Sequence, residues 1–172
     1  MLTIRPLTEA DIEAVAAIHV RSWQAGYAGV IADDYLAGLD AAAIAERRRN
    51  RPVPPGARTL VAADDAQVIG FVSFGPYQRE DDTFDSETGQ LYAIYVDPEH
   101  WGRGAGRELM SAARAGLAAA GFAGMRLWVL EENHRARRFY ERAGLAPDGV
   151  RDTYTPHGSA QELPELRYAG AL

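Results

Sequence analysis

Apolar residues recur along this chain at two spacings, one typical of strands and one typical of helices. Short apolar runs bounded by proline, glycine or acidic residues predict strands at 2–5, 58–64, 68–75, 90–96 and 125–130, and two more after residue 144. Apolar positions three or four residues apart predict helices at 12–23, 107–120 and 133–143, and a helical stretch at 35–51 in which Asp40 caps the run that follows it. The short segment Asp64-Asp65-Ala66-Gln67 joins the second and third strands, which indicates a hairpin.

The run "QLYAIYV" at 90–96 alternates imperfectly. Leu91, Ala93 and Tyr95 share one parity, whereas the aliphatic Ile94 and Val96 share the other. A β-bulge near Ala93 would reconcile the two sets, because a bulge inserts one extra residue into a strand.

The predicted order is β-α-α-β-β-β-α-β-α-β-β, which indicates an α/β protein with a mixed sheet. The helix at 107–120 connects two strands as a βαβ crossover, so those strands are expected to run parallel. No repeat or linker interrupts the 172 residues, and we expect a single domain over 1–172.

The composition narrows the classes of protein and of site. There is no cysteine, so disulfides, thiolate metal sites and a cysteine nucleophile are excluded, and the four histidines show no ligand spacing. We therefore expect no metal. The N-terminus lacks the pattern of a signal peptide and no run is long enough to span a membrane, which predicts a soluble, cytoplasmic protein with no membrane partner. A net charge of −6 argues against nucleic acid as a partner.

The stretch "DPEHWGRGAGREL" places glycines at 102, 104 and 106 between a predicted strand and a predicted helix. Glycines there let backbone N–H groups converge at a helix N-terminus, where an anion is stabilised. Arg103 and Arg107 can add positive charge. The alternative is a tight turn that is merely rich in glycine. A P-loop does not fit because the chain has no lysine, and a dinucleotide fingerprint does not fit because Arg107 stands at its third glycine position.

Together with "LWVLEENHRARRFYERAGL" further on, this stretch resembles the two signatures of the GNAT superfamily of N-acetyltransferases. The first signature is the acyl-CoA pyrophosphate loop, in which Trp101 occupies a position that is usually glutamine or arginine. The second is matched by Asn133, Ala136, Phe139, Tyr140, Gly144 and Leu145. The resemblance extends over nearly the whole chain. It implies a GNAT-like fold, in which helices flank a single mixed central sheet with a splayed parallel strand pair.

The resemblance also implies acetyl-CoA as the acyl donor and an amine as the acceptor. The residues it places at acetyl-CoA are Ile94, Tyr95, Val96, Gly102, Arg103, Gly104, Ala105, Gly106, Arg107, Asn133 and Tyr140. Tyr140 would act as the general acid, and a backbone N–H near Val96 would stabilise the oxyanion. The alternative for Tyr140 is a packed core tyrosine. Candidate walls of the acceptor site are Trp23, Tyr27, Tyr92 and Tyr154, each with an equally good reading as a core residue.

The sequence assigns no general base. Gln90 and Trp128 stand where many relatives carry glutamate. The proton would therefore pass through water to Glu131, Glu132 or an acidic residue of the acidic connector, the polar segment 78–89. His19 lies on an apolar helix face and is interpreted as a packed residue.

The expected activity is acetyl transfer to a primary amine of a small molecule or peptide, by direct attack in a ternary complex. The missing carboxylates leave one alternative, a catalytically inactive regulatory module that binds CoA. The oligomeric state stays open, with a homodimer as one option. Five acidic residues between Glu80 and Glu87 are either a solvated surface or a feature that attracts cationic acceptors.

Overall fold

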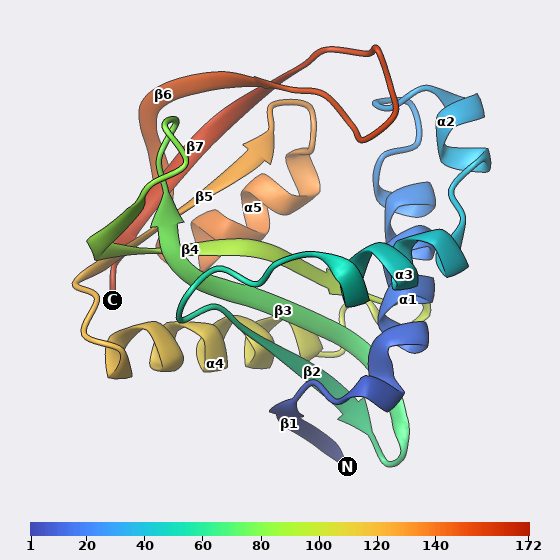
Figure 1. Cartoon of the computed structure of the whole chain (residues 1–172), viewed down its shortest axis with the longest axis horizontal. Coiled ribbons are helices and arrows are strands. Elements are labelled where there is room, and N and C mark those ends of the chain that lie inside the picture. The colour runs from blue at the N-terminus through green and yellow to red at the C-terminus, as the bar shows by residue number, and fades with distance from the viewer.

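One seven-stranded mixed sheet organises the computed structural model of this protein, which describes all 172 residues (Figure 1). The strands are β1 (Leu2–Pro6), β2 (Arg58–Asp64), β3 (Gln67–Gln78), β4 (Phe84–Val96), β5 (Gly124–Leu130), β6 (Ala146–Tyr154) and β7 (Leu163–Ala171). The helices are α1 (Ile12–Gly26), α2 (Asp33–Ala37), α3 (Ala41–Asn50), α4 (Ala105–Ala119) and α5 (His134–Arg142). The order in the sheet is β1-β2-β3-β4-β5-β7-β6. The predicted fold class is confirmed.

Two segments differ from the prediction. The second predicted helical stretch is divided into α2 and α3. The predicted cap at Asp40 is confirmed, because its side chain accepts a hydrogen bond from the Ala42 amide at the start of α3. The acidic connector is largely a continuation of β3 and β4, paired as far as Gln78 and Phe84. The hydrogen bonds between paired strands join backbone groups and do not require apolar side chains. This pairing therefore gives no apolar periodicity from which it could be predicted.

The centre of the sheet contains its one parallel strand pair. β4 and β5 pair only from Thr88 opposite Gly124 to Gln90 opposite Arg126, and then separate. On its other side β4 stays paired with β3 as far as Val96. The register of that ladder shifts where Ser73 lies opposite Ala93 and Phe74 lies opposite Leu91, which leaves Tyr92 as an extra residue. The predicted bulge near Ala93 is confirmed.

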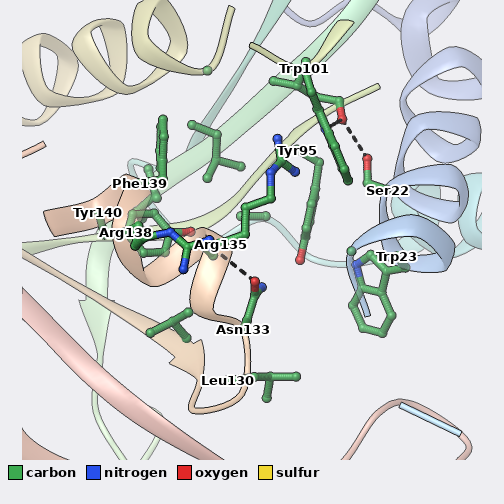
Figure 2. Close-up of a pocket in the computed structure, with 18 of the residues that line it drawn as sticks. Ser22, Trp23, Tyr95, Trp101, Leu130, Asn133, Arg135, Arg138, Phe139 and Tyr140 are labelled. Atoms are coloured by element: carbon green, nitrogen blue, oxygen red, sulfur yellow. Dashed lines mark hydrogen bonds between the residues drawn. The ribbon is translucent and has the colours of Figure 1, made fainter. Parts of the chain in front are cut away.

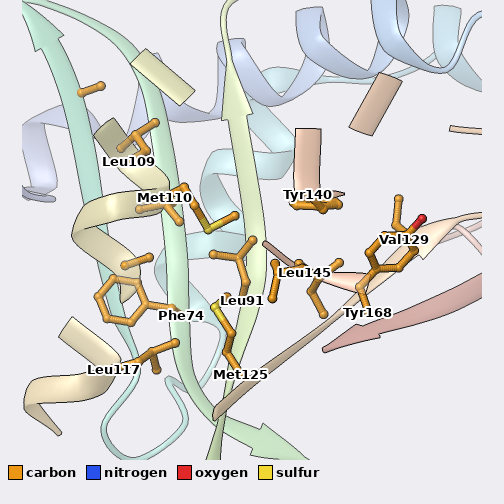
Figure 3. Close-up of a cluster of buried hydrophobic side chains, with 14 of the residues drawn as sticks. Phe74, Leu91, Leu109, Met110, Leu117, Met125, Val129, Tyr140, Leu145 and Tyr168 are labelled. Carbon is orange, nitrogen blue, oxygen red and sulfur yellow. The ribbon is translucent and has the colours of Figure 1, made fainter. Parts of the chain in front are cut away.

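Helices cover both faces of the sheet. On one face, α1 packs on Val61 and Phe71, with α2 and α3 beside it. On the other face, α4 and α5 enclose the largest cluster of buried side chains, which includes Phe74, Leu109 and Tyr168 (Figure 3). Alternate residues of β2 and β3 point to opposite faces, so these strands contribute to both clusters.

Two contacts join α1 to the end of β4. The Arg21 guanidinium pairs with the buried carboxylate of Asp97, directly after the strand. The Ser22 hydroxyl donates to the Val96 carbonyl at 3.1 Å. These contacts hold α1 beside the edge where β4 and β5 separate. No helix of the structure is both long enough and apolar enough to cross a membrane.

Candidate active site

A cleft of about 830 Å³ follows the opening between β4 and β5 (Figure 2). Thirty residues line it, and they come from α1, β4, the turn before α4, the first turn of α4, β5, α5, β6 and β7. One end of the cleft lies at the glycine turn and the other lies among aromatic side chains of α1 and β6. The separation of the two strands is therefore what creates the cavity.

The glycine turn ends directly at the N-terminus of α4. Gly102 and Gly104 have φ angles of 76° and 92°, a region that residues with a Cβ atom rarely occupy. Gly106 is already inside α4, where a Cβ would lie 3.3 Å from the Phe139 ring. The turn thus brings the free N–H groups at the start of α4 to the cleft, with little side-chain bulk in front of them.

Backbone groups of β4 also face the opening. The Asp97 amide donates to the Ile69 carbonyl at 2.8 Å, and antiparallel alternation then directs the backbone groups of Tyr95 toward β3. Those of Ile94 and Val96 point to the opposite side, from which β5 has departed. The Val96 carbonyl accepts hydrogen bonds from Ser22 and from Trp101 Nε1, the latter at 2.7 Å. The Val96 amide is left facing the cleft.

Four arginines make the glycine end of the cleft basic. Arg107 comes from the first turn of α4, and Arg135, Arg138 and Arg142 come from α5. The guanidinium carbon of Arg135 lies 3.3 Å from the centre of the Trp101 ring (Figure 2). Together with the helix N-terminus, these side chains form an environment suited to several negative charges.

Tyr140 and Asn133 lie where α5 meets the cleft (Figure 2). The Asn133 side chain caps α5 by accepting from the Ala136 amide at 3.1 Å. Tyr140 is buried, and its hydroxyl has no hydrogen-bond partner within the protein. Burial, with a smaller contribution from Tyr95, raises the pKa of the Tyr140 phenol well above its ordinary value. The phenol therefore keeps its proton at neutral pH.

Aromatic side chains form the other end of the cleft. The Trp23 ring meets Tyr27 edge to face at 5.0 Å and Tyr154 at 6.4 Å between ring centres. Tyr92 also lines the cleft, and its hydroxyl donates to the Pro76 carbonyl. All four side chains that the sequence suggested as walls of the acceptor site thus line one cavity.

Most of the other residues singled out in the sequence line the cleft as well. Arg103 is exposed beside the glycine turn and does not line the cleft. Glu131 and Glu132, named from the sequence as possible proton acceptors, do not line it either, and Glu131 pairs with Arg151 at 2.8 Å. His19 packs between Trp23 and Tyr95, and burial lowers its pKa to about 4, with smaller contributions from nearby arginines. The acidic residues between Glu80 and Glu87 do not line the cleft, and Asp85 caps its own turn and pairs with Arg79.

Sequence reasoning missed two groups of lining residues. Arg135, Arg138 and Arg142 are spaced by three and four positions, so one face of a helix could have been read from the sequence. Glu165 on β7 is the one acidic residue that lines the cleft. It stands alone in its strand with no motif around it, and only the pairing of β7 with β5 brings it there.

The sequence of this chain is similar to those of known acetyltransferases. The family model described as "Acetyltransferase (GNAT) family" matches residues 15–145. The chain is 37% identical over 134 residues to the Bacillus subtilis protein named uncharacterized N-acetyltransferase YuaI, covering 77% of this chain and 74% of that protein.

Solved structures show the same fold. The PaiA N-acetyltransferase from Thermoplasma acidophilum, in complex with coenzyme A, superposes with a TM-score of 0.75 at 20% identity and covers 100% of this chain and 99% of its own. The yncA protein from Salmonella typhimurium, with its cofactor acetyl-CoA, gives a TM-score of 0.68 at 23% identity and covers 99% and 94%.

Proposed function

The chain belongs to the GNAT family of acetyltransferases, and we propose that it moves an acetyl group from acetyl-CoA to a primary amine of a small molecule or peptide. The observation that carries this proposal is the continuous cleft from the glycine turn, through the gap between β4 and β5, to the Tyr140 hydroxyl. The two ends of the cleft differ in character, one at the glycine turn and one among aromatic side chains, so donor and acceptor can occupy it together. This arrangement supports direct attack in a ternary complex.

The residues of the cleft fit an acyl-CoA. The amides that follow Gly102 and Gly104, together with Arg107, Arg135 and Arg138, would hold the phosphate groups. The exposed backbone of Ile94 and Val96 would pair with the amides of the pantetheine arm. When bound, acetyl-CoA supplies an acetyl group activated as a thioester.

Two groups of the chain suit acyl transfer. The Val96 amide is positioned to donate to an oxygen that gains negative charge in the gap. Tyr140 holds a proton on its hydroxyl and can donate it to a departing thiolate. Its raised pKa keeps the phenol protonated until that donation is needed.

The proposal is tested by following release of CoA from acetyl-CoA in the presence of primary amines, with mass spectrometry of the acetylated amine. The two products should form in equal amounts and only when both substrates are present. Tight binding of acetyl-CoA without release of CoA with any amine would favour the regulatory module instead.

A further inference from the structure

Glu165 occupies a distinctive place in the cleft. It is the one carboxylate among the thirty lining residues, whereas the four lining arginines belong to α4 and α5. In the register of the sheet it lies opposite Leu130, the last residue of β5, and opposite Asp152 of β6. Leu130 belongs to the apolar cluster of Trp23, so Glu165 borders the aromatic end of the cleft.

The charged groups around Glu165 leave its carboxylate without a partner. It makes no ion pair and no side-chain hydrogen bond within the protein. The nearest base on its own strand, Arg167, is held at 2.6 Å by Asp148 and also donates to Tyr77. The neighbours on β6 are the carboxylate of Asp152 and the phenol of Tyr154. Trp23 of α1 and Tyr27, which follows α1, contribute uncharged aromatic side chains to this end. A half-buried carboxylate with no partner is suited to a cation brought by a ligand.

We propose that Glu165 binds the ammonium group of the acceptor and accepts a proton from it, and that the acceptor is a primary amine with one positive charge and an apolar body. This assignment rests on the proposed acetyl transfer. The rings of Trp23, Tyr27 and Tyr154 supply apolar walls and faces that attract a cation. Because Glu165 is the one carboxylate that lines the cleft, a second or third ammonium group would find no counter-charge inside it.

The proton transfer is balanced. A primary amine with a pKa of about 10.4 arrives as an ammonium ion. One N–H bond breaks, the proton forms an O–H bond on the Glu165 carboxylate, and the electron pair stays on nitrogen. The neutral amine can then attack, and Glu165 returns its proton to solvent.

The environment of Glu165 supports this role. Burial, with a smaller contribution from the negative charge of Asp152, raises the pKa of the Glu165 carboxyl to about 7. A carboxylate with this pKa is ionised in a large share of molecules at neutral pH and is a stronger base than an exposed glutamate. General bases work best when their pKa lies near the operating pH.

The experiment compares the wild type with Glu165→Gln and Asp152→Asn, using 2-phenylethylamine, butylamine and spermidine as acceptors. For the wild type, kcat/KM for the best amine should rise with pH through an apparent pKa of about 7. Glu165→Gln should lower kcat/KM at pH 8 by about 10²-fold and remove this rise. Asp152→Asn removes a negative charge outside the cleft, so activity should persist and the rise should shift to lower pH.

Binding provides a readout that does not depend on turnover. Calorimetry should show acetyl-CoA affinity unchanged in both variants, and weaker binding of the best amine to the CoA complex of Glu165→Gln. If the wild type acetylates amines and Glu165→Gln keeps its activity and pH profile, the assignment of Glu165 is wrong and the proposed function stands. Preference for spermidine over both monoamines contradicts the substrate class. If the wild type acetylates no amine, the proposed function fails, and the role of Glu165 fails with it.

Discussion

The Arg135 guanidinium lies over the Trp101 indole, with its central carbon 3.3 Å from the ring centre. The same indole donates to the Val96 carbonyl at 2.7 Å. Trp101 thus joins the glycine turn to β4 through its N–H group and to α5 through its ring. Its position is usually glutamine or arginine in the GNAT signature, and here an aromatic ring orients a neighbouring arginine instead.

Replacing Trp101 should therefore weaken the binding of acetyl-CoA. Trp101→Ala removes both contacts, and we expect affinity to fall about tenfold, or about 1.4 kcal/mol. Trp101→Phe keeps an aromatic ring beside Arg135, so its affinity for acetyl-CoA should fall less. Calorimetric titration measures both. Wild-type affinity in a folded Trp101→Ala protein would show that the turn does not depend on this side chain.

Gly104→Ala should weaken acetyl-CoA binding at least tenfold, because an added Cβ disfavours the φ of 92° that brings the turn to the start of α4. Gly121→Ala is a matched control at the other end of the same helix, since Gly121 has a φ of 94° and open space around it. Both substitutions should cost about 1–2 kcal/mol of stability. Equal acetyl-CoA affinity in the two variants would remove the glycine turn from the binding site.

Tyr140→Phe should lower kcat by about 10²-fold and leave acetyl-CoA affinity nearly unchanged, because the ring still packs and only the proton donor is lost. Tyr168→Phe is the control. Its ring lies 6.2 Å from that of Tyr140, but its hydroxyl accepts from Arg137 and donates to Glu141, both on α5. We expect lower stability with kcat retained. A Tyr140→Phe enzyme with normal kcat between pH 7 and 9 would exclude Tyr140 as the acid.

Stability should depend on pH through Glu165. Its pKa in the folded protein is about 7, above the ordinary value of 4.5, so the folded state binds this proton more tightly than the unfolded state does. The resulting stability is present below pH 4.5 and is lost as pH rises through 7. Relative to Glu165→Gln, the wild type should lose stability over this range. Urea unfolding of both proteins from pH 4.5 to 8 measures the difference between their free energies of unfolding. The other titrating groups are the same in both proteins, so their contributions cancel in this difference. A constant difference would mean that the carboxyl titrates normally.

The glycine turn, the βαβ crossover and the bulge in β4 could be predicted because each leaves a local pattern. Glycines mark positive φ angles, and an interrupted alternation marks an extra residue in a strand. The extension of β4 to Phe84 could not be predicted, because polar side chains on an exposed hairpin carry no alternation. The role of Trp101 was also out of reach, since it depends on a residue of α5 that lies 34 positions away along the chain.

The acceptor end of the cleft was only partly predictable. Trp23, Tyr27, Tyr92 and Tyr154 could be named as aromatic candidates, but the sequence does not show that they share a cavity. Glu165 lies twenty positions beyond Leu145, the last residue of the second GNAT signature, and reaches the cleft only because β7 inserts between β5 and β6. Strand order of this kind is set by tertiary packing and leaves no local signal.

Amine-dependent release of CoA from acetyl-CoA tests the central claim most directly. The chain contains no cysteine, so a thiol reagent in the assay reports only the CoA formed. With wild-type protein, acetyl-CoA and a primary monoamine, we predict steady release over many turnovers, with one acetylated amine for each CoA and a sharp loss of rate in Tyr140→Phe. Binding of acetyl-CoA without amine-dependent release across a broad amine panel would contradict the account.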